Sequence, residues 1–336
     1  MFAEMTVRKK IIIFPLFFIP WLFPLASVAQ ATDSLTPETA TASPPYSKTN
    51  TASATEKKYK VRRALVAGFN VAAYGSSLII LNNTWYKNFP RERLHSFNDS
   101  KEWLQMDKAG HVFSAYFEGK YCIELWNWAK MERKKAIWIG GLSGAAYQTV
   151  IEFLDGTSAK WGWSWADFGA NLLGSGLLIG QELAWGEQRL QLKMGYNPEK
   201  YEPALNSRVN ELFGKGGSER FLKDYNAQTY WLSANLRAFF PKTKLPRWLN
   251  IAAGYGATGM LGGFDNKWTD AGGNEINRSD IQRRRQWYLS PDIDLTRIKT
   301  NKVLVKYLLQ FLNMWRIPLP TLEITGGKAK VKLLSF

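Results

Sequence analysis

From about residue 61 to residue 186, apolar residues recur with the spacing of α-helices. Ser164, followed three positions later by Asp167, is typical of a capped helix start. The pattern predicts four helices, at Ala64–Tyr86, Asp107–Trp128, Ala136–Ile151 and Ser164–Trp185. Because each has a broad apolar surface, we expect them to pack into one compact four-helix unit.

The lengths of the uncharged runs indicate which of these helices could cross a membrane. The first run contains 23 residues and the third contains 16, whereas a spanning helix needs about 20. The first segment is therefore long enough to span, and the others are more typical of core or partly inserted helices. Gly140 with Gly144, and Gly176 with Gly180, are small-residue pairs that predict close approach of helix backbones.

After Trp185 the pattern changes from helical spacing to alternation, which is typical of half-buried strands. Strands are predicted at Leu190–Tyr196, Gln228–Phe240, Trp248–Leu261, Gln286–Ile298 and, as one or two strands, Thr321–Phe336. The Gly- and Asn-rich stretch 265–280 predicts a long hairpin loop, and an apolar stripe over 302–315 predicts a helix. The predicted fold class is α+β: an N-terminal compact four-helix unit followed by an antiparallel β-rich domain with one covering helix.

The last strand leaves an outer-membrane β-barrel component open as an alternative. The chain ends on Phe336, and such barrels often end in an aromatic strand. However, the same strand carries Lys328, Lys330 and Lys332 on one face, and five or six strands are fewer than the eight of the smallest single-chain barrel. We therefore favour an open antiparallel sheet packed on a helix.

The N-terminus has the features of a secretory signal. A basic start at residues 8–10 precedes the uncharged apolar run 11–28, and small residues follow near Ala29 and Ala31. We predict a signal peptide at 1–31, with an uncleaved N-terminal anchor as the alternative. Residues 32–60 are mostly Thr, Ser, Ala and Pro and predict a disordered tether. The helical domain then covers 61–187, and the β-rich domain covers 188–336.

Composition narrows the range of partners. A single cysteine, Cys122, excludes a disulfide-stapled module and a Cys-based zinc site. The formal charge of +16 favours anionic partners. Because an exported protein meets little nucleic acid, we expect an anionic membrane surface or envelope lipid instead, and no nucleic acid. The densest basic run, at residues 57–63, lies directly before the first apolar helix.

Three of the predicted helices carry a narrow stripe of polar residues on an otherwise apolar surface. The second has Asp107, His111, Ser114 and Glu118 within about 60° of one another at 3.6 residues per turn. The stripes of the other two helices contain Gln148, Glu152 and Asp155, and then Asp167 and Asn171. Since an isolated buried carboxylate is very costly, the stripes should face one another or a wet cleft.

Two interpretations of these stripes stay open. In the first, the polar groups bond to one another and set the register of the helices. In the second they form a functional cluster, in which a histidine and a carboxylate act as an acid–base pair or a divalent metal is bound. The candidate cluster consists of Asp107, His111, Glu152, Asp155, Asp167 and Asn171. The candidate metal ligands within it are His111, Glu152, Asp155 and Asp167.

The order of these motifs resembles a known family. The motifs are Asp107-Lys108-Ala109-Gly110-His111, then Glu152 with Asp155, then Ser164, Asp167, Asn171 and Gly174. They resemble the YfiM-like predicted periplasmic lipoproteins, a family of unknown function, and are distantly similar to VanZ-like membrane proteins. The stretch Lys223–Trp231 resembles the longer, Bacteroidetes-type members. The resemblance implies an envelope location and no particular activity, and this chain lacks the lipobox cysteine.

These observations predict an exported protein of the periplasm or outer membrane of a Gram-negative bacterium. Its leading function is structural or membrane-interacting, without an assigned activity. The alternative is a metal- or acid/base-dependent hydrolase or transferase that acts on anionic envelope lipid or glycan. The polar cluster would carry that chemistry, with a divalent metal as its possible cofactor.

Overall fold

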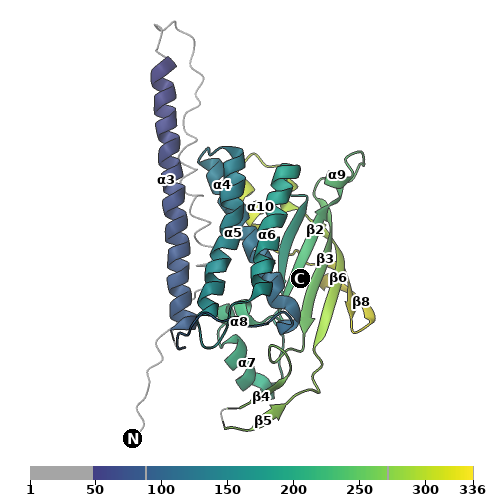
Figure 1. Ribbon diagram of the computed structural model, residues 1–336. Coiled ribbons are helices and arrows are strands. Elements are labelled where there is room, and N and C mark those ends of the chain that lie inside the picture. Colours follow the sequence, from purple (N-terminus) through teal and green to yellow (C-terminus); the bar gives the residue numbers. More distant parts are fainter. Residues whose placement is uncertain (1–47, 88, 271, 336) are drawn as a thin grey trace.

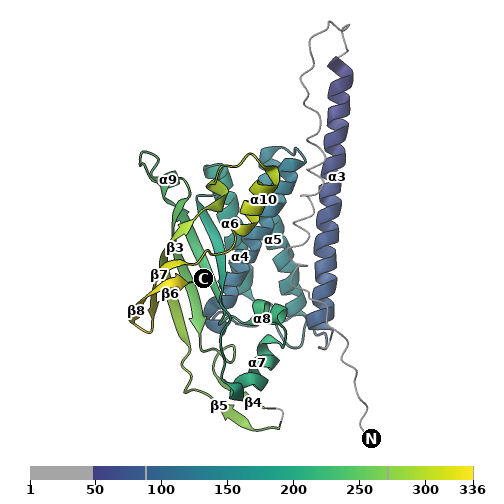
Figure 2. The same cartoon turned by 180° about the vertical axis from the view of Figure 1, so that it is seen from behind.

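The computed structural model describes residues 48–335, except residues 88 and 271. The predicted signal peptide 1–31 and the first part of the predicted tether therefore lie outside the described residues. A layer of long upright helices stands beside a twisted sheet, and short helices and a hairpin lie at the lower end of the molecule in Figure 1. Seen from behind, α10 lies beside the upper part of α4 (Figure 2). This mixed architecture confirms the predicted α+β class.

The helical half contains the four predicted helices. They are α3 (Lys48–Leu81), α4 (Met106–Trp128), α5 (Arg133–Gly156) and α6 (Trp165–Ala184), with a π-helical turn at Asn82–Tyr86 and a 3₁₀ turn at Glu102–Gln105. Ser164 caps α6 as expected, because its Oγ accepts a hydrogen bond of 3.0 Å from the amide of Asp167. The helix boundaries agree with the sequence within a few residues, except at the start of α3.

The predicted tether is wrong from residue 48 onward, because α3 begins at Lys48. The described side chains of this part are exposed, apart from the half-exposed Tyr59. Composition correctly indicated the lack of core contacts. A helix that has already formed over the apolar residues can nevertheless extend through good helix formers such as Lys, Glu and Ala without such contacts.

Helices α4, α5 and α6 pack against one another at very short range. A Cβ on Gly140 would lie 2.6 Å from the backbone nitrogen of Ile123, and one on Gly144 would lie 2.1 Å from the carbonyl oxygen of Ala115. The first glycine pair therefore permits the predicted close approach. The pair Gly176 and Gly180 does not, since a Cβ on either residue would have nothing within 4 Å among the described residues.

Helix α3 lies along α4 and α5 rather than inside the bundle (Figure 1). Tyr74 stacks on Tyr147 with ring centroids 4.8 Å apart, and the hydroxyls of Ser77 and Tyr147 lie 2.7 Å apart. At its other end Arg62 reaches the carbonyl oxygen of Trp128. Among the described residues, Thr55–Leu81 is the one helical stretch long and apolar enough to cross a membrane.

The C-terminal half forms a six-stranded antiparallel sheet with the order β1-β2-β3-β6-β7-β8. Its strands are β1 (Leu190–Tyr196), β2 (Gln228–Asn235), β3 (Leu249–Thr258), β6 (Arg284–Ile293), β7 (Leu319–Thr325) and β8 (Lys328–Ser335). Between β3 and β6, the predicted loop 265–280 contains a small hairpin of β4 (Lys267–Thr269) and β5 (Glu275–Asn277). The predicted strands are confirmed, with β1 and β8 at the two edges.

Several short elements were not predicted. They are the 3₁₀ turns Pro203–Leu205 and Leu295–Arg297 and the helices α7 (Asn206–Phe213), α8 (Gly217–Lys223) and α9 (Leu236–Phe239). Helix α9 ends the predicted strand 228–240 early, because the Asn235 side chain accepts a hydrogen bond from the amide of Ala238 at 2.9 Å and caps the helix. Helix α7 packs Val209 and Phe213 against Leu261.

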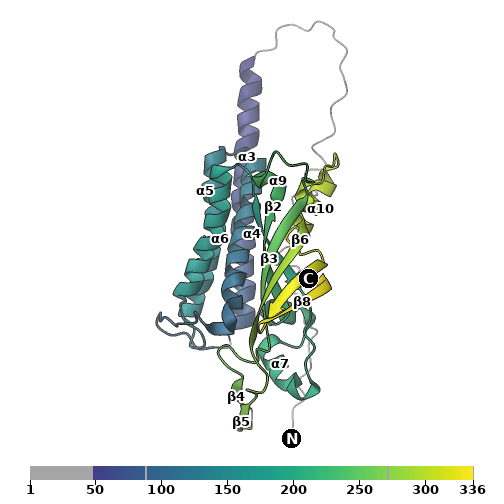
Figure 3. The same ribbon diagram turned by 90° about the vertical axis from the view of Figure 1, so that its right-hand side faces the viewer.

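The predicted covering helix is present as α10 (Val303–Leu312), and its Phe311 packs against the core cluster that contains Met194 of β1. Its residues Leu304 and Leu308 are 65% and 49% exposed, so the opposite side of α10 faces outward. Helix α4 covers the sheet as well, where Phe113 packs on Tyr230 of β2 with ring centroids 5.6 Å apart. Figure 3 shows this arrangement from the side, with α4 between α5 and α6 and the sheet. One hydrophobic core therefore joins the two halves of the chain.

Candidate functional site

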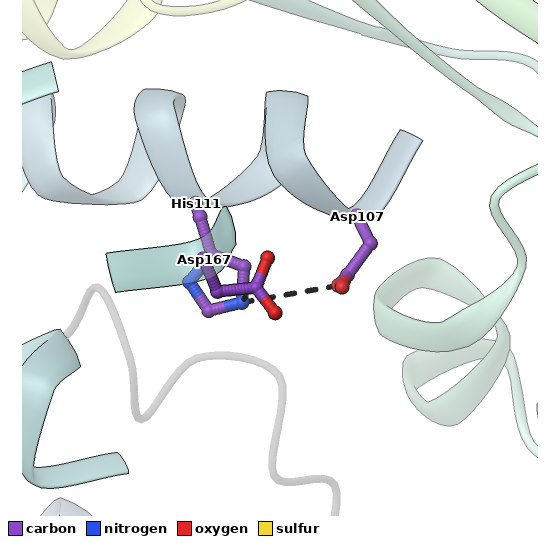
Figure 4. Close-up of side chains that lie close together, drawn as sticks. All are labelled: Asp107, His111 and Asp167. Atoms are coloured by element: carbon purple, nitrogen blue, oxygen red, sulfur yellow. Dashed lines mark ion pairs between the residues drawn. The ribbon is translucent and has the colours of Figure 1, made fainter. Parts of the chain in front are cut away.

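The polar stripes of α4, α5 and α6 converge at the lower end of the helical layer. His111 stands at the centre, and its Nε2 atom faces a carboxylate oxygen from each helix. The distances are 3.9 Å to Asp107 Oδ1, 3.7 Å to Glu152 Oε1 and 3.8 Å to Asp167 Oδ1. Figure 4 shows Asp107 and His111 one turn apart on α4, with Asp167 beside the imidazole ring. The close glycine contacts between the helices permit this convergence.

The other ring nitrogen of His111 has a defined partner. Nδ1 lies 3.0 Å from Oδ1 of the fully buried Asn171 on α6. An amide oxygen only accepts hydrogen bonds, so Nδ1 carries the proton in this contact. When the imidazole is neutral, Nε2 has a lone pair directed toward the carboxylates, which is the arrangement seen at histidines that bind metals or accept protons.

Lys108 provides the positive charge of the cluster. Its Nζ lies 2.5 Å from Asp99, 3.0 Å from Asp107 and 2.8 Å from Asp167. Although burial lowers the pKa of Lys108, the Asp107 and Asp167 carboxylates raise it above its usual range. The ammonium group therefore stays charged, and it holds the loop before α4 against the start of α6.

Four carboxyl groups share the cluster with this single lysine: Asp99, Asp107 and Asp167 contact Lys108, whereas Glu152 faces His111. Burial and the neighbouring Asp155 raise the pKa of Glu152 to about 8, and burial together with Asp107 raises that of Asp167 to about 8. Glu152 is 1% exposed, and its Oε1 has no hydrogen-bond partner among the described residues. The cluster thus has more carboxyl groups than its own cations can pair with.

Asp155 faces the outer part of the cluster. Tyr86, from the π-helical turn after α3, donates a hydrogen bond of 2.7 Å to Asp155 Oδ1. Burial raises the pKa of this carboxyl to about 6. Asp155 is therefore the predicted site residue that is hydrogen-bonded to the turn after α3 rather than to His111. Glu118, further along the α4 stripe, lies apart from the cluster and accepts a hydrogen bond of 2.8 Å from Gln148.

Three members of the cluster were not among the predicted site residues. Lys108 lies about 100° around α4 from Asp107 and enters the cluster because its side chain is long. Asp99 comes from the loop before α4, where it also accepts a hydrogen bond from Ser164 Oγ at 2.5 Å. Tyr225 comes from the β-rich half and donates a hydrogen bond of 2.6 Å to Asp107. The sequence signal available for Lys108 was its place in the Asp107–His111 motif.

A second feature of the helical layer is its uncharged outer surface. The outward positions of α5 and α6 carry large apolar side chains, including Trp138, Leu142, Phe153, Trp165 and Leu173, all between 44% and 69% exposed. Helix α3 adds Val61, Leu65, Val71 and Ile79, between 52% and 75% exposed. We call these exposed faces of α3, α5 and α6 the apolar wall. Such an extended exposed patch marks an interaction surface.

Comparison with known proteins bears on the helical layer alone. The model of the family described as "Predicted periplasmic lipoprotein (DUF2279)" matches residues 96–179. No curated protein and no solved structure matches this chain. The matched segment contains the six predicted site residues with Asp99 and Lys108, and it leaves out Tyr225 and also Tyr86, which bonds to Asp155. The expected resemblance to the predicted periplasmic lipoprotein family is thus confirmed for residues 96–179, in agreement with an exported protein of the cell envelope.

Proposed function

We propose that this protein is a membrane-bound envelope protein whose apolar wall contacts the acyl chains of a lipid bilayer. The observation that carries the proposal is the wall itself. It exposes large apolar side chains on three adjacent helices, and its α5 and α6 parts contain no charged residue between Ala136 and Ile151 or between Phe168 and Gln181. In water this surface would be strongly unfavourable.

The dimensions of the wall agree with a bilayer. The uncharged run Ala64–Tyr86 is about 34 Å long at 1.5 Å per residue, and the hydrocarbon core of a bilayer is about 30 Å thick. Tyr74 and Tyr86 of this run bond to Ser143 and Asp155 of α5, so the two helices run in the same direction at the same level. The wall therefore forms one band across three helices.

Charge complementarity also supports a membrane as partner. At the upper end of the wall, α3 exposes Lys57, Lys58 and Lys60, and α5 begins with the exposed residues Arg133, Lys134 and Lys135. Basic residues that border an apolar segment are attracted to anionic lipid head groups. The polar cluster lies at the opposite end, beyond the uncharged stretches. With the wall in a bilayer, the cluster lies at the boundary between lipid and water.

Site-specific labelling of the full chain tests this contact. Cys122 is the chain's only cysteine and is buried. A polarity-sensitive fluorophore can therefore be attached selectively at Leu173→Cys on the wall and, as a matched control, at Thr269→Cys on the exposed hairpin strand β4. In vesicles that contain phosphatidylglycerol, we expect a blue-shifted emission and quenching by brominated acyl chains for the label at position 173 only. Equal quenching at both positions, or none at position 173, would contradict the proposal.

A second candidate function is acid–base hydrolysis or group transfer on an anionic envelope lipid or glycan. The specific observation in its favour is the position of His111 Nε2 among carboxylates from three helices, close to the end of the wall. A base with a free lone pair beside carboxyls of raised pKa fits proton transfer near neutral pH. Release of the head group from phosphatidylglycerol vesicles, followed by ³¹P NMR, should occur with the wild type and stop with His111→Gln.

A further inference from the structure

The geometry points to a divalent-cation site formed by Asp107, His111 and Asp167. One candidate ligand atom from each of these residues lies within 4.8 Å of the other two. Glu152 Oε1 supplies a fourth ligand from α5, 3.7 Å from His111 Nε2. The inference does not depend on membrane contact, because all four groups belong to the interior of the bundle.

The spacing of these atoms is too wide for hydrogen bonds and suitable for an ion between them. Contacts of 3.7 to 3.9 Å from His111 Nε2 to three carboxylate oxygens exceed the usual limit of about 3.2 Å for hydrogen bonds to nitrogen. Ligands about 2.1 Å from a tetrahedral cation lie roughly 3.4 Å apart. The three distances from His111 Nε2 exceed this value by about 0.3 to 0.5 Å, and the atoms of Asp107, His111 and Asp167 all lie within 4.8 Å of one another, so the side chains need to move inward only slightly to bind one ion.

Glu152 gives independent support for a bound ligand. Its side chain is 2% exposed, and Oε1 has no hydrogen-bond partner among the described residues. Its other oxygen receives only a long contact of 3.4 Å from the amide of Ser164. A buried carboxylate oxygen without a partner is costly, and it faces the space next to His111 Nε2. A cation in that space would satisfy it.

Groups around the four ligands hold them in the orientation that a cation needs. Asn171 fixes the proton on His111 Nδ1, and Tyr225 donates to the same Oδ1 atom of Asp107 that faces His111. Lys108 lies 2.8 Å from Asp167 Oδ1 and neutralises part of the charge. Such outer partners orient ligands in metal sites. One imidazole with several carboxylates suits Mn²⁺ or Zn²⁺ better than Cu⁺, which prefers thiolate and thioether ligands.

The chain allows a direct test because it contains only two histidines. The full chain is purified in detergent, treated with a chelator and titrated with Mn²⁺ while the imidazole resonances are followed by NMR. We expect paramagnetic broadening of His111 at a stoichiometric Mn²⁺ concentration, and weaker broadening of His95, which lies on the neighbouring loop and is not a ligand. Zn²⁺ should compete with Mn²⁺ and raise the thermal unfolding midpoint.

Matched variants distinguish binding at the proposed site from binding by any acidic side chain of the bundle. Asp167→Asn should weaken Mn²⁺ binding at least tenfold. Glu118→Gln changes a carboxyl further along α4, the helix of Asp107 and His111, that bonds to Gln148 instead, so it should leave binding unchanged. If Asp167→Asn does not fold, Glu152→Gln replaces it as the test. Wild-type protein that shows no selective broadening of His111, or variants with equal affinity, would overturn the inference, whatever the result of the vesicle experiment.

Discussion

Two buried groups of charged residues in the described part of the chain, one in each half, differ in how directly their charged side chains are paired. In the sheet, the fully buried Asp292 pairs with Lys193 Nζ at 2.8 Å and with the Arg316 guanidinium. Ser233 also donates a hydrogen bond to Asp292, and Arg316 lies 4.5 Å from the ring centroid of Trp231. Each charged group of this sheet network has close partners of opposite charge or polar bonds.

The helical cluster has a different balance: its four carboxyl groups share one lysine, and the second nitrogen of His111 faces three of them at 3.7 to 3.9 Å. A network that only holds helices together would be expected to resemble the sheet network, because unpaired buried charges destabilise a fold. The comparison teaches that the sheet network pairs its central carboxylate directly with two cations, whereas the helical cluster has more carboxyl groups than cations and fits a further proton or cation. Excess charge of this kind is typical of functional sites.

Replacing the lysine of each group should give the largest difference. Lys108→Met leaves three carboxylates without their ammonium group and should lower the free energy of unfolding by about 3–5 kcal/mol. Lys193→Met should cost roughly half as much, because Asp292 keeps Arg316 and Ser233. Denaturant unfolding of both variants in detergent measures the two losses. Equal losses of unfolding free energy would show that the charges of the two groups are paired equally well.

The second-largest difference between the two groups should appear in the pH dependence of stability. In the cation-free protein Glu152 and Asp167 have pKa values of about 8, whereas unfolded carboxyls titrate near 4. The native state therefore keeps protons that the unfolded state loses, and stability falls as pH rises from about 4 through about 8. We expect a lower unfolding midpoint at pH 8.5 than at pH 6 after chelation, and recovery at pH 8.5 with Mn²⁺. The double variant Glu152→Gln/Asp167→Asn should reduce this slope, and an unchanged slope would count against the assignment.

Neutralising one carboxyl in each group should have effects of opposite sign. At pH 8.5, Glu152→Gln removes an unpaired charge while it keeps the shape, so we expect the cation-free protein to gain about 1 kcal/mol. Asp292→Asn leaves Lys193 and Arg316 without their carboxylate and should destabilise. Thermal unfolding of the two variants under the same conditions measures both changes. A loss at both positions would mean that the helical cluster is a structural network like that of the sheet.

The smallest expected effect concerns the scaffold of the helical cluster. Ser164→Ala removes the cap of α6 and the hydrogen bond to Asp99, and should cost about 1 kcal/mol. Ser164→Thr keeps a hydroxyl and serves as the control. Because the Ser164 hydroxyl contacts the backbone amide of Asp167 and the Asp99 carboxylate rather than a proposed ligand atom, Mn²⁺ affinity should change less than with Asp167→Asn. A larger loss of affinity than of stability would make Ser164 part of the site.

The local pattern of the chain was sufficient to predict most elements. Spacing of 3.6 residues located α4, α5 and α6, and it placed Asp107 and His111 on one face of α4. Alternation located the strands of the sheet, because side chains of a strand point to opposite faces in turn. Helices α7 and α8 were missed since they are too short for a periodic signal. The start of α3 was missed because helix extension does not require burial.

What the sequence by itself determined, therefore, is the kind of element at each position and the face on which its polar groups lie, since both follow from the period of the backbone. Tertiary structure decided which groups meet. Asp99 and Tyr225 reach Lys108 and Asp107 from a loop and from the other half of the chain, and no local period relates them. The excess charge of the cluster is also a tertiary property, because it depends on which carboxylates share one lysine and how deeply they are buried.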